Sequence, residues 1–162
     1  MRNSIETWIV VLATGIATVS AIALPGASVW ASSFPWEEPY AQYEDFELSP
    51  GFQPDPRLGS GTSGGTEDGS GCGKIDSTPD HLLTLTRDFD FLRISVEAPG
   101  DITLLVEKPN GEQVCSDENL GVLPEVSGNY PAGRYKIWVG DWGNSYEYQI
   151  CLSQDSDKQC FN

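Results

Sequence analysis

Few residue types in this chain could do catalytic chemistry, because it has one histidine among 162 residues. That count excludes every catalytic or metal site that needs two histidines. A nucleophilic site around His81 would need an activated nucleophile and a group that orients the base. The order Pro79-Asp80-His81, just before an apolar run, favours a structural role instead. We expect Asp80 and His81 to hold the turn that enters the first strand, with Pro79 fixing that turn.

Carboxylates are the second group with chemical potential. Asp117, Glu118 and Asn119 follow a predicted strand, and Asp101 lies in another turn. Carboxylate and amide oxygens are ligands for Ca²⁺, which takes six to eight of them. The alternative is that these residues simply favour solvated turns, and no EF-hand pattern is present. A paired-carboxylate hydrolase using Asp80, Asp101 and Asp117 is a further alternative, although it would need a cleft that a small sandwich hardly offers.

One aromatic residue is predicted on an outer face. In the run from Arg134 to Val139, alternation places Trp138 on the same side as Arg134 and Lys136. A large aromatic on a charged face indicates a binding platform for a sugar ring or a peptide. Trp142 and Tyr130, in flanking turns, would extend that platform. The alternative is that the aromatic-rich arm before the domain, or the second sheet of the sandwich, covers Trp138.

The net charge of the chain limits the classes of partner that it could bind. The chain carries 24 Asp and Glu against 9 Lys and Arg, a formal net charge of −15, and its sequence pI is about 4.1. Nucleic-acid recognition needs clustered Lys and Arg, so the composition argues against it. Protein or polysaccharide ligands remain.

The N-terminus predicts export. Arg2 precedes an apolar segment, Trp8–Leu24, which Pro25-Gly26 interrupts before the small-x-small site Val29-Trp30-Ala31. This order is typical of a secretory signal peptide, so we predict residues 1–31 as signal peptide with cleavage after Ala31. The alternative is an uncleaved anchor, for which the apolar segment is at the short limit. If the signal peptide is cleaved, it is the only part of the chain that we expect to contact the membrane. The exported product could then be in the periplasm, on the outer surface or in the medium.

The next segment, residues 32–70, is acidic and rich in Pro, Gly and Ser, without apolar periodicity. We predict a disordered linker there. Its aromatic residues could still dock on something, including the domain that follows; they are Phe34, Trp36, Tyr40, Tyr43, Phe46 and Phe52.

Residues 71–162 predict an all-β domain. Short alternating runs are separated by turns such as Pro99-Gly100-Asp101 and Pro109-Asn110-Gly111, which is typical of an antiparallel sandwich or barrel. Leu92, Ile94 and Val96 should face the core. The same holds for Ile102, Leu104 and Val106, for Tyr135, Ile137 and Val139, and for Tyr148, Ile150 and Leu152. We predict no helix in this region.

Four cysteines in an exported chain predict two disulfides, with three pairings open. Alternation places Cys151 on the outer face of the last strand, where Cys160 in the polar tail is the nearest partner. That leaves Cys72 for Cys115. Zinc is weakly supported, because no two cysteines have zinc-finger spacing.

The order of short motifs from residue 46 to residue 153 resembles one bacterial group. The motifs include Cys72-Gly73, Gly100-Asp101-Ile102-Thr103-Leu104, Cys115-Ser116-Asp117-Glu118 and Pro131-Ala132-Gly133 followed by Ile137-Trp138-Val139-Gly140. They resemble uncharacterised secreted bacterial proteins that are similar to the bacterial pre-peptidase C-terminal domain. This resemblance implies a small jelly-roll-like β-sandwich without catalytic activity, which assists secretion, localisation or substrate binding.

We therefore expect an exported, non-enzymatic β-sandwich module with a binding or accessory role, stabilised by calcium if its acidic turns bind the ion. The alternatives are the small hydrolase described above and an accessory or inhibitory partner of a secreted peptidase.

Overall fold

The computed structural model describes residues 41–117 and 123–161, and these residues form strands and no helix. The predicted signal peptide and residues 32–40 of the predicted linker lie outside the described residues. Within the described ranges there is no helix with the length and apolar character to cross a membrane. The strands are β1 (Phe46–Leu48), β2 (Arg57–Thr62), β3 (Glu67–Asp68), β4 (Lys74–Ile75), β5 (His81–Leu85), β6 (Phe89–Glu97), β7 (Ile102–Glu107), β8 (Gln113–Asp117), β9 (Glu125–Tyr130), β10 (Gly133–Asp141) and β11 (Glu147–Ser153).

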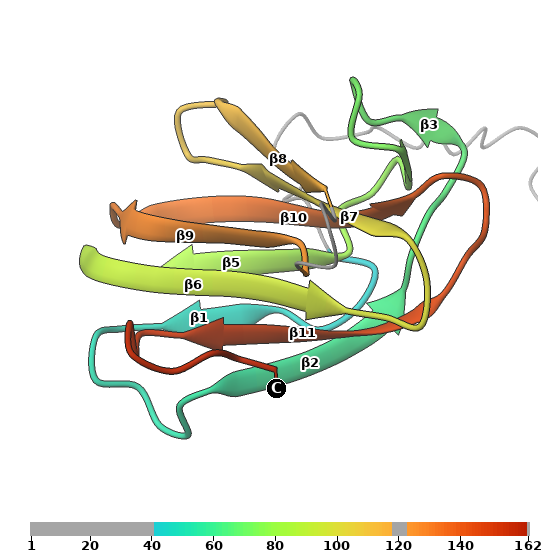
Figure 1. The fold of residues 1–162 in the computed structure, drawn as a ribbon. Coiled ribbons are helices and arrows are strands. Elements are labelled where there is room, and N and C mark those ends of the chain that lie inside the picture. The colour runs from blue at the N-terminus through green and yellow to red at the C-terminus, as the bar shows by residue number, and fades with distance from the viewer. Residues whose placement is uncertain (1–40, 118–122, 162) are drawn as a thin grey trace, which may run out of the picture. The chain divides into compact units, whose positions relative to one another are not determined.

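The strands form two sheets (Figure 1). In the larger sheet β10 is central: it pairs with β5 and β4 along one side and with β7 on the other, while β1, β3 and β8 lie outermost. The smaller sheet has the order β2-β11-β6-β9 and is antiparallel throughout. The all-β sandwich prediction is confirmed, with one exception to its antiparallel character, because β1 runs parallel to β5.

The predicted alternation is confirmed in the core. Apolar side chains that face inward from both sheets form one cluster, in which Leu92, Ile94 and Val96 of β6 are fully buried. The inward residues of β7, β10 and β11 join it as expected. A second, smaller cluster lies on the outer face of the larger sheet and consists of Cys72, Ile75, Leu105 and Trp138.

The linker prediction is wrong for residues 41–70, because this segment supplies β1, β2 and β3. Phe46, Leu48 and Phe52 are buried in the main core, so the alternative of aromatic docking on the domain is the correct one for this part. The glycines of β2 are needed for packing. A Cβ on Gly59 would come within 2.8 Å of the Phe46 ring, and one on Gly61 would come within 2.4 Å of the Tyr148 hydroxyl.

Both predicted disulfides are confirmed, Cys72–Cys115 and Cys151–Cys160. Their cysteines are 43 and 9 residues apart in sequence. In the loop-entropy model, bridges of these lengths stabilise the fold by about 4 and about 3 kcal/mol. The first ties the β3–β4 hairpin, residues 67–75, to β8; the second ties the C-terminal tail, residues 154–161, to β11.

Candidate functional site

His81 is a structural residue in this fold. It begins β5 and is fully buried. Its Nδ1–H donates to the main-chain oxygen of Glu44 at 2.8 Å, and the Tyr148 hydroxyl donates to Nε2 at 2.8 Å. Burial lowers the pKa of the imidazole, although the Glu44 carbonyl and nearby Asp45 act in the opposite direction. Both ring nitrogens are therefore engaged in joining the N-terminal segment to β5 and β11.

Asp80 is the most perturbed carboxyl group. It is fully buried, and its Oδ2 accepts a hydrogen bond from the Val139 amide at 2.6 Å. Its other oxygen, Oδ1, has no hydrogen-bond partner among the described residues. Burial raises the pKa of Asp80 to about 7, the Val139 amide partly offsets this, and nearby Asp76 adds to it. Asp80 and His81 were predicted to hold only the turn before β5. They also bind distant strands, because Asp80 accepts from β10 and His81 accepts from Tyr148 of β11.

The predicted calcium ligands are only partly described. Asp101 and Asp117 are exposed near one end of the β7–β8 pair, where Asp117 lies opposite Thr103. Glu118 and Asn119 lie outside the described residues. Within the described ranges, no three His, Cys, Asp or Glu side chains come together to hold a metal ion. Asp80 is buried while Asp101 and Asp117 are exposed, so the three acids of the hydrolase alternative do not share one environment.

The predicted aromatic platform is wrong in two of its three residues. Trp138 does lie on the outer face of β10, but only 7% of it is exposed, and Tyr130 belongs to the main core with 4% exposed. Trp138 is covered because it packs with Cys72, Ile75 and Leu105. Its indole Nε1 is buried without a hydrogen-bond partner among the described residues. Trp142 alone is exposed as predicted, at 53%.

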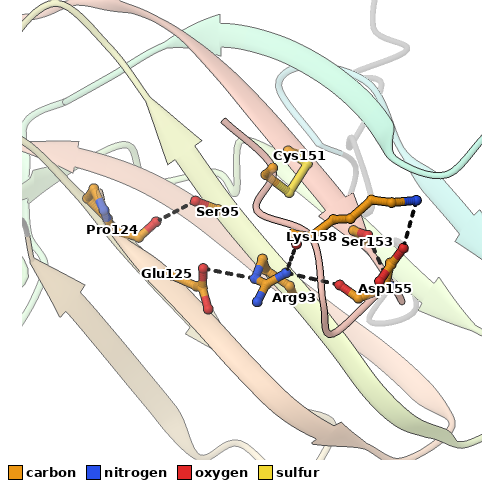
Figure 2. The surroundings of a disulfide bond; sticks show 9 residues. Arg93, Ser95, Pro124, Glu125, Cys151, Ser153, Asp155 and Lys158 are labelled. Atoms are coloured by element: carbon orange, nitrogen blue, oxygen red, sulfur yellow. Dashed lines mark hydrogen bonds and ion pairs between the residues drawn. A yellow bond between two sulfur atoms is a disulfide. The ribbon is translucent and has the colours of Figure 1, made fainter. Parts of the chain in front are cut away.

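A buried arginine lies on the outer face of the smaller sheet, and alternation alone would have left it exposed. Arg93 of β6 is only 5% exposed. Its Nε lies 3.0 Å from Oε2 of Glu125 as an ion pair, without the direction of a hydrogen bond. Its Nη1 donates to the main-chain oxygens of Asp155, at 3.0 Å, and of Lys158 (Figure 2). The guanidinium also lies over the Phe91 ring, 5.2 Å from its centroid.

The C-terminal tail is thus fixed at several points over β6 and β11. Cys160 is bonded to Cys151, and the Asp155 amide donates to the Ser153 hydroxyl at 3.1 Å. Lys158 forms an ion pair with Asp155 at 3.0 Å, which lowers the pKa of that carboxyl group (Figure 2). The tail therefore covers the outer face of the smaller sheet around Arg93 and Cys151.

Farther along that face, the described residues leave a hollow. This hollow of about 510 Å³ is lined by Ser60, Glu97, Ala98, Pro99, Glu147, Tyr148 and Gln149. Gln149 lies between Ser60 and Glu97 in register, so β2, β11 and β6 each supply one polar side chain to a single row. In the next row, the Thr62 hydroxyl donates to Glu147 at 2.9 Å. The alternation of β11 places Glu147 and Gln149 outside, but no motif in the sequence indicates the hollow beside them.

The arrangement suits binding better than catalysis. The described carboxylates of the hollow are exposed, and the buried titratable groups Asp80 and His81 lie under other strands rather than in an open cleft. A general base must reach the proton it removes. The hollow instead offers carboxylates, an amide and a hydroxyl on a rigid sheet.

Comparison with known proteins finds an uncharacterised relative and similar solved structures. No family model matches the chain. An uncharacterised protein of Synechococcus elongatus is 43% identical over 99 residues, which make up 58% of this chain and 72% of that protein. The pre-peptidase C-terminal domain of a collagenase from Bacillus anthracis is similar over 70% of this chain and 99% of that domain, with a TM-score of 0.46 and 12% identity. The relative confirms the resemblance to uncharacterised bacterial proteins that the sequence motifs indicate, and the fold class rests on the two sheets themselves.

Proposed function

We propose a function from the premise that this chain belongs to the same family as the uncharacterised protein of Synechococcus elongatus. The chain acts as an exported, non-catalytic β-sandwich module that binds a protein partner at the cell surface or outside the cell. The observation that carries this proposal is the open, acidic hollow on the outer face of the smaller sheet.

Export is supported by the two disulfides and by the signal-peptide pattern of residues 1–31. Disulfides persist in oxidising compartments outside the cytoplasm. Expression of the full chain in a bacterial host with a periplasm should therefore yield a product beginning at Ser32. Intact-mass measurement of the exported product tests this, and a full-length, membrane-bound product would support the uncleaved anchor instead.

A protein partner is favoured over a polysaccharide by the chemistry of the hollow. Sugar rings commonly stack on exposed aromatic side chains, but two of the three residues predicted for that purpose, Trp138 and Tyr130, are buried, and the exposed Trp142 does not line the hollow. The lining includes two carboxylates, Glu97 and Glu147, and no cationic side chain. Together with the formal charge of −15, this favours a segment that carries Lys or Arg.

We also propose that a calcium ion binds near the end of the β7–β8 pair, where Asp101 and Asp117 lie exposed, and stabilises the fold. Extracellular calcium modules bind the ion weakly through oxygen ligands on loops. Calcium would act on stability here and not on chemistry.

The binding proposal is tested with the exported, oxidised chain and two probes, a ten-residue lysine peptide and dextran. We expect salt-sensitive binding of the lysine peptide by calorimetry and no binding of dextran. The double variant Glu97→Gln, Glu147→Gln should weaken peptide binding at least about tenfold, a loss typical of desolvated charge pairs. The control variant Glu47→Gln, at an exposed position of β1, should bind as the parent chain does. Equal binding by both variants, or binding of dextran alone, would overturn the protein-binding proposal.

A further inference from the structure

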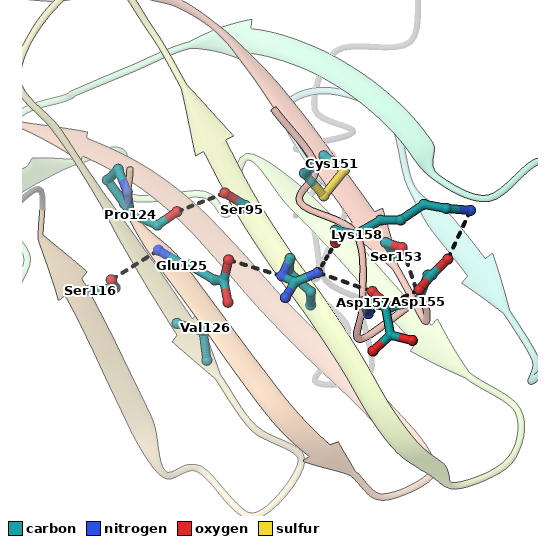
Figure 3. Close-up of polar contacts among 12 residues, drawn as sticks. Ser95, Ser116, Pro124, Glu125, Val126, Cys151, Ser153, Asp155, Asp157 and Lys158 are labelled. Carbon is teal, nitrogen blue, oxygen red and sulfur yellow. Dashed lines mark hydrogen bonds and ion pairs between the residues drawn. A yellow bond between two sulfur atoms is a disulfide. The ribbon is translucent and has the colours of Figure 1, made fainter. Parts of the chain in front are cut away.

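The two sheets leave a seam between the edge strands β8 and β9. Among the described residues β8 pairs only with β7, and β9 pairs only with β6. At one end of the seam the Glu125 amide donates to the Ser116 hydroxyl at 3.0 Å, which joins the two strands (Figure 3). Toward the β7–β8 turn lies a hollow of about 420 Å³, lined by residues from both strands.

The floor of the seam is aromatic, and its polar atoms are already satisfied. The rings of Tyr130 and Tyr135 lie 5.2 Å apart and both residues are buried. The Tyr130 hydroxyl donates to the Val126 oxygen at 3.0 Å, and the Tyr135 hydroxyl donates to the Pro131 oxygen at 2.7 Å. Half-buried Val114 and Val126 line the walls. The seam therefore offers apolar surface without a buried polar group that lacks a partner.

The edge of β9 offers main-chain hydrogen-bonding groups to this space. The Val96 amide donates to the Pro124 oxygen, so alternation along β9 turns the main-chain groups of Glu125 and Ser127 away from β6. Glu125 already uses its amide on Ser116. Ser127 is exposed, and its outward main-chain groups have no hydrogen-bond partner among the described residues. Beside it, a Cβ on Gly128 would meet nothing within 4 Å, so the edge is open.

We propose that this seam receives an extended, basic segment of a partner protein, which adds to β9 as a further strand. Strand addition uses unpaired main-chain groups for affinity and adjacent pockets for side-chain selection, and the seam has both. Asp117 is exposed at one end of the β8 side, on a chain of formal charge −15, and this complements Lys and Arg in the partner. At the other end Glu112 is paired with Lys108 at 2.9 Å, so the acidic end of the seam is the one at Asp117.

β9 is also held in place before any partner arrives. Glu125 joins it to β8 through its amide (Figure 3). Its carboxylate pairs with Arg93 of β6, and Arg93 in turn binds the C-terminal tail (Figure 2). A rigid edge loses less conformational entropy on binding than a mobile one. The seam is lined by other residues than the acidic hollow described above, so the two proposals stand or fall separately.

Two synthetic peptides test the proposal on the exported, oxidised chain. The first is an eight-residue peptide of alternating valine and lysine. The second has the same sequence with alternate amides N-methylated, which keeps the charge and removes the donors needed for pairing. We expect the first to shift the amide resonances of Ser127 and Gly128 and the second to bind at least about tenfold more weakly, as loss of main-chain hydrogen bonds predicts. Equal affinity of both peptides, or shifts confined to Glu97 and Gln149, would overturn the proposal.

Variants at the edge complete the test. Ser127→Pro removes the outward N–H, which edge strands tolerate, and should weaken binding of the first peptide about tenfold. Ser127→Ala retains the N–H and should bind as the parent chain does. If Ser127→Pro fails to fold, Val114→Lys places a charge in the seam and should abolish the binding, with Val114→Thr as its control. Unchanged affinity in the folded blocking variant would refute strand addition at β9.

Discussion

Replacing Asp80 by asparagine removes the one fully buried carboxyl group whose second oxygen has no hydrogen-bond partner among the described residues. Asparagine has nearly the same shape, and its side-chain oxygen can still accept the Val139 amide, as Oδ2 of Asp80 does at 2.6 Å. The variant therefore changes the ability to ionise while leaving the contact with β10 in place.

The magnitude follows from the pKa of Asp80, which burial raises from 3.8 to about 7. A raised pKa in the folded state means that the fold favours the protonated form. Stability from this group is fully present below pH 3.8 and is lost as the pH rises through the folded value near 7. At about 1.4 kcal/mol for each pKa unit, the full loss amounts to about 4 kcal/mol.

The assay is urea unfolding of the oxidised parent chain and of Asp80→Asn at pH 5 and pH 8. About two of the pKa units lie in this window, so the variant should gain about 3 kcal/mol relative to the parent between the two pH values. His81, whose pKa burial lowers, titrates in both proteins and cancels in this comparison. Asp90→Asn, at an exposed position of β6, is the control and should show no such gain. An equal difference between parent and Asp80→Asn at both pH values would refute the assignment of a buried, proton-binding carboxyl group.

Three further outcomes follow from the contacts. Arg93→Met leaves the Glu125 carboxylate and two main-chain oxygens of the tail without their partner. The variant should lower the unfolding free energy by about 3 kcal/mol and speed proteolysis of residues 154–161. An unchanged urea midpoint would contradict the role of Arg93 in fixing the tail. Calcium should raise the thermal midpoint of the exported chain progressively as its concentration increases, and should have less effect on Asp117→Asn, whereas a flat titration would end the calcium proposal. Trp138→Phe loses an indole N–H that has no partner among the described residues, and it should change stability by less than about 1.5 kcal/mol, while Trp138→Ala should cost about 3 to 5 kcal/mol. Similar losses in both variants would show that the N–H is satisfied.

Alternation along the sequence was sufficient to predict the long strands, because each has one face in a single core. β6, β7, β10 and β11 all alternate, and their inward side chains lie where the pattern places them. The same alternation led to the disulfide pairing, since an outward Cys151 could reach Cys160 in the tail. These inferences hold because burial on one face of a strand leaves a two-residue period in the sequence.

The N-terminal strands could not be predicted in this way, because their composition serves contacts with residues far along the chain. β2 looks like a flexible Gly/Ser segment, yet its glycines give room to the rings of Phe46 and Tyr148. The same is true of β9 later in the chain, which contains Ser127 and Gly128 and shows no clear alternation, yet forms an edge strand of the smaller sheet by pairing with β6. Neither strand has the apolar alternation by which a strand is recognised in a single sequence, and main-chain pairing itself leaves no pattern of residue types.

The error over Trp138 has a specific physical cause. The predicted orientation is correct, but orientation does not determine exposure when a disulfide lies on the same face. Trp138 lies opposite Leu105, and Leu105 lies opposite Cys115, so the three side chains form one row on the outer face of the larger sheet. The bond from Cys115 to Cys72 therefore brings the β3–β4 hairpin over this row, where it buries the indole. The pairing of Cys72 with Cys115 was predictable from the sequence, but the cover over Trp138 required the register of three strands, which no local pattern specifies.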